Sequence, residues 1–480
     1  MERFLKLKSR MKSCQTPAWW DYIIPGIVFV IAFVCFDQAY DMKLTMLQSS
    51  DLLDCIFAGK PFDFYRYTWS IASTAGYLGR FAPISGAIYN IVIYITMAIW
   101  ALPVYVLNQL FHFAQYANIL NIWGRVMVIG LSVLCTFLLS KLSVKAFHDP
   151  VESRWSGYLF LTSPILMFCV VIYNQYDIFS VTATLLALLF YFDKKYYKFS
   201  MLIALAVCYK LFPIFIFIPL ILLVEKRLSK LVQHFIIGLS LYGITTLLWS
   251  AFDAGYHITQ SEMMPDFGFY QWVFKAEIPG GISNISIFVF CILVISAIAY
   301  WMKPKESDLS AFSVFLAGAA YISFFVFVNW HPQWMIVMLP FLIMMLFRMR
   351  NRKFAFILEI AVSIGFILIN CIQYLDKSIF NETLLVNLFH FTYFGNISSF
   401  VMNCFYKTGL TVVLPMTIFS ASLFMLLFLS YKEYKQSKKD RIKVEKDMSE
   451  YRSLLYCRTL VTMIYMLFPI VAYFGAFFQK

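Results

Sequence analysis

The chain has 480 residues, of which 61% are hydrophobic and 14% charged, and its mean hydropathy is +0.73. Soluble domains carry about 45–50% apolar and about 25% charged residues, so this composition excludes a soluble globular protein. The net charge of +13 does not indicate a nucleic-acid partner, because Lys and Arg gather in short loops, as in the cytoplasmic loops of membrane proteins. The sequence predicts an all-α, polytopic integral membrane protein.

Thirteen apolar runs predict transmembrane helices. A bilayer requires about 20 residues, and shorter helices are tolerated where they meet other protein elements. The first run, from Tyr22, lacks a small-residue cleavage signal, so we expect it to be retained as a helix. The predicted spans are residues 22–40, 122–144, 157–173, 177–192, 198–211, 212–224, 231–250, 282–302, 310–329, 333–348, 354–372, 409–431 and 456–478.

Alternating these spans places 28 of the 39 Lys and Arg residues on one side, which the positive-inside rule assigns to the cytoplasm. Residues 82–107 are apolar enough to add a span, but one extra crossing would move every later basic cluster outside. We therefore expect a re-entrant hairpin, breaking at Pro103, or an interfacial helix, with an ordinary span as the alternative. The large outer loops are then 41–121, 251–281 and 373–408, and 432–452 is a charged cytoplasmic linker.

The stretch "IYNQYDIFS" (172–180) interrupts apolar sequence with three polar residues, Asn174, Gln175 and Asp177. Burying such groups is costly unless they are paired or hydrated. With 157–173 running outward and 177–192 returning, these residues form a tight outer corner. Their polarity predicts that the corner lines a hydrated pocket.

Three other stretches send polar side chains to the same outer level. Lys210 follows Tyr209 just before Pro213 breaks the chain, and a lysine there is not expected to face lipid. "FVNWHPQWMIV" (327–337) and "FDQAYDMKLT" (36–45) supply the others, namely Asn329, Trp330, His331, Gln333, Trp334, Asp37 and Asp41. Individually, the tryptophans could be interfacial anchors, His331 could bond backbone and Asp37 could simply end a span, so the prediction rests on their convergence.

This set of residue types suits transfer from a membrane-bound phosphate donor. Lys210 or His331 could supply a cation beside the phosphate, and an aspartate at a membrane exit could act as general base. Amide side chains can form hydrogen bonds with sugar hydroxyls, and tryptophan rings can pack against the apolar face of a sugar ring. No CxxC pair occurs among the ten cysteines, and loop residues Asp51, Asp54 and Asp63 are weak indications of a metal, so none is assigned.

Two segments resemble the core of the GT-C glycosyltransferases, in particular the polyprenyl-phosphate-mannose-dependent, family 87 type of mannosyltransferase. They are "SPILMFCVVIYNQYDIFSVTATLLALLFYFDKK" and "FSMLIALAVCYKLFPIFIFIPLILLVEKR", with a Ser-Pro helix, a GQ-D-like corner and K-x-x-P. Asn174 stands where the family often has Gly. "LLDCIFAGKPFDFY" (52–65) resembles the family's first outer loop, and "NWHPQWMIVMLPFLIM" weakly resembles a late helix with an outer histidine.

The resemblance implies an inverting transfer of a sugar from a polyprenyl phosphate on the extracytoplasmic side, to a glycan or lipid acceptor. By position, Asp41 would be the base, with Asp51 and Asp54 as rivals, and Lys210 would hold the donor phosphate. The remaining implied site residues are His331 and Arg80 at the phosphate, and Asn174, Gln175, Asp177, Tyr209, Gln333 and Trp334 around the pocket. No metal or other cofactor is indicated beyond the lipid-linked donor.

The resulting organisation is a cytoplasmic tail (1–21), a GT-C-like catalytic core (22–350) and C-terminal transmembrane helices (351–480). Two other functions remain open. A transporter or flippase of lipid-linked glycans would usually show internal repeats and midplane polar sites, which we do not find. A lipid-linked glycan polymerase or ligase would share the outer pocket but use a glycan pyrophosphate donor.

Overall fold

The computed structural model describes residues 16–37, 39–72, 86–147, 150–259, 273–347, 349, 351–373, 383–389, 407, 411–436 and 452–467. Its secondary structure is almost entirely helical, which confirms the predicted all-α class. The helices are α2 (Ile23–Cys35), α3 (Ala39–Phe57), α4 (Phe64–Ala72), α5 (Ile91–Phe111), α6 (Tyr116–Phe147), α7 (Pro150–Leu161), α8 (Pro164–Leu166), α9 (Ile178–Phe192), α10 (Tyr196–Tyr209), α11 (Pro213–Val224), α12 (Leu228–Phe252), α15 (Ile287–Trp301), α16 (Glu306–Phe327), α17 (Leu339–Leu346), α18 (Arg352–Gln373), α19 (Leu384–Phe389), α21 (Val413–Gln436) and α22 (Arg452–Met463).

Shorter elements join these helices. There are 3-10 turns at η1 (Trp19–Tyr22), η2 (Pro61–Asp63), η4 (Pro332–Val337) and η7 (Ile464–Met466), and a π-helix at η3 (Met167–Ile172). Two residues each from β1 (Glu277–Ile278) and β2 (Ile285–Ser286) form a small antiparallel hairpin.

The chain is a polytopic membrane protein, although the predicted count of thirteen spans is not confirmed. Within the described residues, seven helices are long and apolar enough to cross a membrane, and five apolar helices are shorter. The seven are Ile91–Phe111, Tyr116–Phe147, Ser153–Ile172, Leu228–Phe252, Glu306–Phe327, Arg352–Gln373 and Val413–Lys432. The predicted spans 333–348 and 456–478 coincide with helices only in part, because η4 precedes the short α17 and residues beyond 467 lie outside the described ranges.

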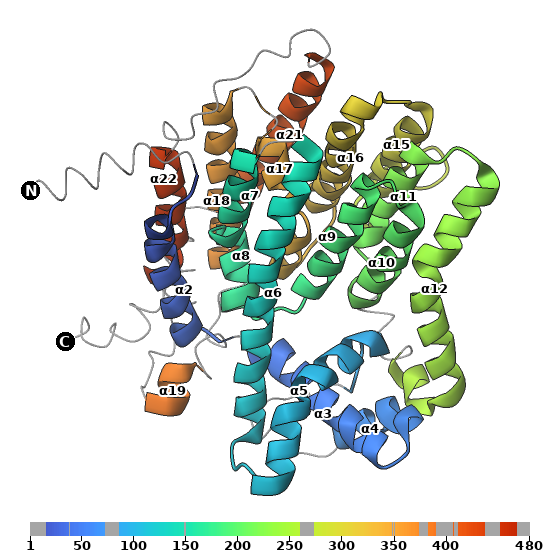
Figure 1. Cartoon of the computed structure of the whole chain (residues 1–480), viewed down its shortest axis with the longest axis vertical. Coiled ribbons are helices and arrows are strands. Elements are labelled where there is room, and N and C mark those ends of the chain that lie inside the picture. The colour runs from blue at the N-terminus through green and yellow to red at the C-terminus, as the bar shows by residue number, and fades with distance from the viewer. Residues whose placement is uncertain are drawn as a thin grey trace, which may run out of the picture.

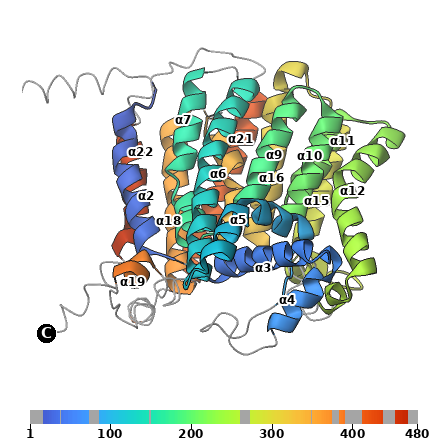
Figure 2. The same cartoon turned by 60° about the horizontal axis from the view of Figure 1, so that its bottom comes forward.

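The helices form a bundle in which α6, α7, α9, α10 and α16 run side by side (Figure 1). The predicted outer loop 41–121 is itself largely helical, since it contains most of α3 and all of α4 and α5, and it ends inside α6. Figure 2 shows α3 lying across the lower end of this bundle, with α5 beside it.

The expected break at Pro103 is wrong, because α5 continues through this proline from Ile91 to Phe111. Proline is tolerated inside apolar helices where neighbouring groups satisfy the freed backbone. Whether the helix crosses the membrane stays a prediction, and its position across the end of the bundle in Figure 2 favours the interfacial alternative.

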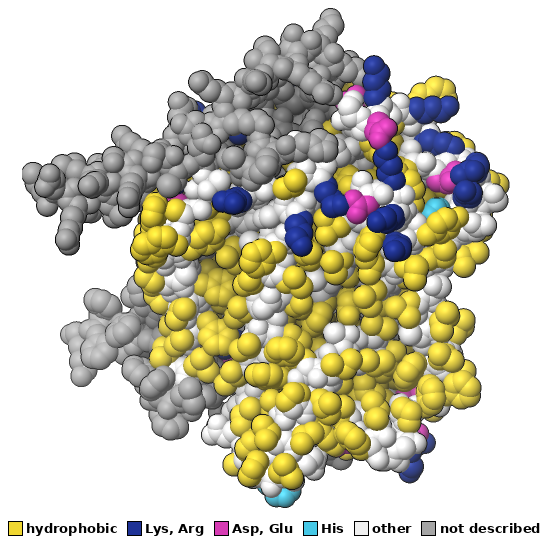
Figure 3. Space-filling model, in the orientation of Figure 1, with side chains coloured by type: hydrophobic (Ala, Val, Ile, Leu, Met, Phe, Trp, Pro, Cys, Tyr) yellow, Lys and Arg dark blue, Asp and Glu magenta, His cyan; other side chains and the backbone are white. Residues whose placement is uncertain are grey.

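The other end of the bundle is basic. Lys145 pairs with Asp193, Lys194 pairs with Glu306, and the Lys226 ammonium donates to the Ala299 carbonyl at 2.9 Å. These contacts bring together loops that the charge rule placed on one side, and Figure 3 shows basic side chains gathered there above a broad apolar surface. Assigning this end to the cytoplasm remains a prediction.

The C-terminal helices pack on the preceding ones through a buried ion pair. Arg458 of α22 donates to both Glu359 carboxylate oxygens, at 2.8 and 3.0 Å, and to the Thr162 hydroxyl near the end of α7. Both charged side chains are at most 2% exposed. The region from 351 onward therefore joins the same packed core, although most of the 432–452 linker lies outside the described residues.

Candidate functional site

The predicted corner at 173–177 is present and is built from two unusual backbone features. The π-helix η3 ends at Ile172, and α9 begins at Ile178 with Asp177 at its N-cap. Between them Asn174 has a φ of 52°, in the left-handed region. Glycine adopts this conformation freely and Asn is among the few other residues that tolerate it, which explains why Asn can stand where a Gly is expected.

Asn174 belongs to a buried polar network centred on Asp37, which the structure places in the turn after α2. The Asp37 carboxylate accepts from Asn174 Nδ2 at 2.8 Å, from Asn121 Nδ2 at 2.8 Å and from Arg125 at 3.1 Å. Asp37, Asn174 and Arg125 are each at most 1% exposed. Asp37 therefore does more than end a span, because it ties α2 to α6 and to the corner.

Arg125 is the residue that sequence reasoning missed. It lies inside the predicted span 122–144, where an arginine is itself a signal, since charges within apolar helices usually mark functional or paired positions. The same rule that selected Lys210 would have selected Arg125.

Asp41 lies beside the corner. It is in the first turn of α3, where the helix dipole favours a negative charge, and its Oδ2 accepts from Gln175 Nε2 at 2.7 Å. Gln175 is 2% exposed, whereas Asp41 is only partly buried. The structure thus brings a partly accessible carboxylate against a buried amide that orients it.

The two rival carboxylates occupy other places on α3. Asp54 accepts a 2.5 Å hydrogen bond from the Tyr105 hydroxyl of α5. Asp51 and Asp54 follow Asp41 by three to four helical turns, which is about 15–20 Å along the helix axis. Among these three acids, the contact with the corner belongs to Asp41.

Lys210 faces the same corner from the end of α10. Its ammonium lies 3.0 Å from Asp177 Oδ1, and it also lies over the rings of Tyr89 and Tyr176, 5.2 and 5.7 Å from their centroids. The Lys210 side chain is 17% exposed, while that of Asp177 is fully buried. Lys210 is therefore a partly accessible cation held by a buried carboxylate and two aromatic rings.

The described contacts of the Tyr209 side chain are with Thr96 and Phe179, and not with Asp177, Tyr89 or Tyr176, which surround Lys210. The Tyr209 hydroxyl lies 3.0 Å from the Thr96 hydroxyl of α5, and its ring packs on Phe179. It connects α10 to the layer formed by α3 and α5, and it is 9% exposed.

The fourth predicted stretch supplies His331, which precedes η4. Its ring packs edge-on against Trp334 at 5.2 Å. Burial lowers the pKa of His331 below its ordinary value, Lys210 lowers it further and Asp41 opposes this effect. His331 is therefore close enough to sense both the cation and the carboxylate of the site.

The tryptophans of that stretch are core residues, not interfacial anchors. Trp334 is 8% exposed and packs against Phe212, while Trp330 is 6% exposed and donates to the Phe325 carbonyl at 2.7 Å. Gln333 has a buried side-chain oxygen with no hydrogen-bond partner in the described part of the chain. Asn329 is exposed, and no described contact joins it to the corner.

Opposite charges at the corner balance one another. Burial raises the pKa of Asp177 above its ordinary value, and the Lys210 ammonium opposes this rise. Asp41 raises the pKa of Asp177 further. The site therefore contains two acids, one lysine and one histidine around a single turn of backbone.

One predicted site residue cannot be placed, because Arg80 lies outside the described residues. Within those residues, no group of three His, Cys, Asp or Glu side chains could hold a metal ion, and Asp63 instead pairs with Arg66 at 2.9 Å.

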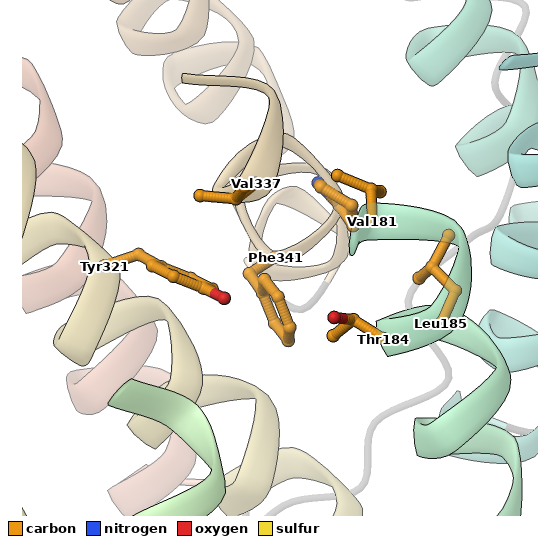
Figure 4. Close-up of a pocket in the computed structure, with 7 residues that line it drawn as sticks. Val181, Thr184, Leu185, Tyr321, Val337 and Phe341 are labelled. Carbon is orange, nitrogen blue, oxygen red and sulfur yellow. The ribbon is translucent and has the colours of Figure 1, made fainter. Parts of the chain in front are cut away.

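A separate gap deeper in the bundle is not a ligand site. It lies between α9, α16 and η4–α17, is lined by apolar side chains apart from Thr184 and Tyr321, and leaves no room for a water molecule (Figure 4). Such a gap is a packing feature of the apolar core.

We next compared the chain with known proteins. No family model matches the chain, and no curated protein matches it significantly. The fold is similar to a crystal structure of ArnT from Cupriavidus metallidurans bound to undecaprenyl phosphate, with 12% identity, a TM-score of 0.41, and coverage of 87% of this chain and 77% of that one. At this identity and TM-score, the likeness by itself assigns neither a family nor an activity.

Proposed function

We propose that the protein is a membrane glycosyltransferase that moves a sugar from a polyprenyl-phosphate donor to a glycan or lipid acceptor. One observation carries the proposal: a single backbone corner holds a carboxylate and an ammonium. Gln175 bonds Asp41, and two residues later Asp177 pairs with Lys210. A base and an anion-binding cation are the two groups that transfer from a lipid phosphate requires.

In the proposed reaction Asp41 acts as general base. It takes the proton of an acceptor hydroxyl as that oxygen attacks the anomeric carbon, and the bond between this carbon and the phosphate oxygen breaks. The electron pair leaves onto the lipid phosphate, whose negative charge the Lys210 ammonium stabilises. A single displacement of this kind inverts the anomeric configuration.

His331 and the aromatic side chains support this arrangement. A neutral imidazole at this position can donate one hydrogen bond to a phosphate oxygen without adding charge. Tyr89, which is partly buried, has its ring beside Lys210, and an aromatic ring suits the apolar side of a sugar. A mannose-like hexose is the proposed sugar, following the family that the sequence resembles.

The proposed active site faces away from the cytoplasm. The polar corner lies at the end of the bundle opposite the loops that carry Lys145, Lys194 and Lys226. Since basic loops remain cytoplasmic, the corner opens on the extracytoplasmic side. Polar groups gathered at one end are also unlike the midplane sites of transporters.

The test uses the full chain in vesicles that contain a radiolabelled polyprenyl-phosphate hexose. Asp41→Asn should lower transfer by about 10²–10⁴-fold, the usual contribution of a general base, with unchanged insertion. Asp308→Asn is the matched control, because Asp308 also lies in the first turn of its helix but at the basic end. Equal transfer by the two variants would rule out Asp41 as the base, and absence of transfer by the unmodified protein with any such donor would reject the proposed function.

A further inference from the structure

We infer that Arg125 is a positioning residue that fixes the end of α2 and the 174–177 corner relative to each other, so that Asp41 and Gln175 meet. The inference rests on the proposed function for its catalytic consequence. Its structural part, that Arg125 holds the corner, can be tested without any measurement of sugar transfer.

The guanidinium of Arg125 makes four hydrogen bonds to two separate parts of the chain. Its Nε donates to Asn174 Oδ1 at 3.1 Å, and one terminal nitrogen donates to Asp37 at 3.1 Å. The other terminal nitrogen donates to the carbonyls of Phe33 and Phe36, at 2.6 and 2.8 Å. These carbonyls belong to the last turn of α2 and to its C-cap residue, where backbone acceptors lack helical partners and a cation is favoured.

These contacts hold both ends of the hydrogen bond between Gln175 and Asp41. Asn174 is the residue before Gln175, so holding its side chain fixes the corner from which Gln175 projects. Asp37 and Phe36 lie between α2 and α3, and Asp41 is in the first turn of α3. Arg125 therefore determines the position of the carboxylate and of the amide that orients it.

The chemistry of arginine suits this role, and lysine would not replace it. A planar guanidinium presents several donors in a rigid fork, while an ammonium is a point charge on a flexible stem. Arg125 is completely buried, and its guanidinium lies 4.2 Å from the Phe33 ring centroid. Replacing a buried ion pair by apolar residues is often neutral or stabilising, so stability alone does not account for Arg125, whereas its four directed hydrogen bonds fit a positioning role.

The first variants are Arg125→Lys and the double variant Asp37→Asn with Arg125→Gln, in which no buried charge is left unpaired. Glu359→Gln with Arg458→Gln is the matched control, since this pair is equally buried and its described contacts involve none of residues 37–41 or 174–177. We expect kcat to fall about 100-fold in both Arg125 variants, the usual effect of displacing a catalytic group by about 1 Å. The KM for the donor should rise less than kcat falls, because Lys210 is attached to α10 and only its contacts with Asp177 and Tyr176 come from the corner.

The second readout is amide hydrogen exchange of residues 168–177 in the purified protein. In the Arg125 double variant we expect exchange to rise about tenfold or more, which corresponds to local opening of the corner, and we expect no change in the control pair. A thermal midpoint close to that of the unmodified protein would show that the double variant is folded.

The two readouts separate the inference from the proposed function. Unchanged exchange in the corner, or normal kcat in the folded double variant, would overturn the positioning role. If the unmodified protein transfers no sugar, the proposed function fails, and faster exchange in the Arg125 variant would still support the role of Arg125 in holding the corner.

Discussion

The loops that carry the basic clusters and the polar corner at the other end of the bundle hold their charges differently. At the basic end, pairs such as Lys194–Glu306 and Arg227–Glu225 have exposed cations. At the other end Asp37, Arg125 and Asp177 are at most 1% exposed. Exposed pairs contribute little to stability and are sufficient to fix topology, whereas buried charges cost several kcal/mol to desolvate and require directed partners. The comparison indicates that the buried charges of the corner depend on the geometry of their partners, whereas the exposed cations of the basic loops do not.

The buried Arg458–Glu359 pair, which lies away from the corner, tests whether a buried charge pair affects only stability or also sugar transfer. Arg458→Met leaves Glu359 buried without its cation, so we expect a loss of about 3–5 kcal/mol in the free energy of unfolding, measured in detergent micelles. Transfer per folded molecule should not change. Arg227→Met, which removes an exposed cation, is the control and should leave the unfolding midpoint unchanged. Equal free energies of unfolding for the two variants would contradict the expectation that a buried charge pair contributes more to stability than an exposed one.

Removing the cation of the corner should weaken donor binding. Hydrogen bonds to charged groups contribute about 1.5–3 kcal/mol, so Lys210→Met should raise the dissociation constant for a polyprenyl phosphate by about 10–100-fold. Titration of the purified protein measures this constant. Lys194→Met removes an exposed lysine from the basic end and should bind the lipid phosphate normally. Identical affinities of the two variants would remove Lys210 from the phosphate site.

The smallest expected effect concerns pH. The pKa of His331 is lower in the folded protein than its ordinary value, so acidification protonates the unfolded chain first and stability falls as the pH drops below about 6.5. Replacing the imidazole by His331→Gln removes this contribution. We therefore expect the variant to lose less stability than the unmodified protein between about pH 7 and about pH 5. Parallel melting curves across this range would contradict the burial of a neutral His331.

The positions of the site residues could be predicted because polar side chains at helix ends stand out against apolar sequence. Asp41, Gln175, Asp177 and Lys210 do converge at one turn, and His331 lies within electrostatic reach of them. Their pairing could not be predicted, because the contact between Asp177 and Lys210 depends on how α9 and α10 pack. Their chemical roles remain proposals.

The parts of the fold that escaped prediction have identifiable causes. α3 mixes polar and apolar residues and includes no long apolar run, so its sequence reads as a loop, although the helix is buried on most sides. Arg125 was missed because the mean hydropathy of residues 122–144 is high enough to predict a transmembrane helix despite the arginine. Pro103 indicated a break in α5, but the helix continues through it because the neighbouring structure accommodates one lost hydrogen bond.

The length of α6 sets the depth at which the proposed reaction would take place in the bilayer. The helix runs for 32 residues, from Tyr116 to Phe147. Lys145 and Arg125 are twenty positions apart on it, which corresponds to about 30 Å, the thickness of the hydrocarbon layer. With Lys145 among the headgroups of one leaflet, Arg125 lies at or just below the headgroups of the other, because α9, which joins the same two levels, has 15 residues and spans about 22 Å. A phosphate carried on a membrane-dissolved chain would thus meet the corner at its natural depth, without being lifted from the lipid.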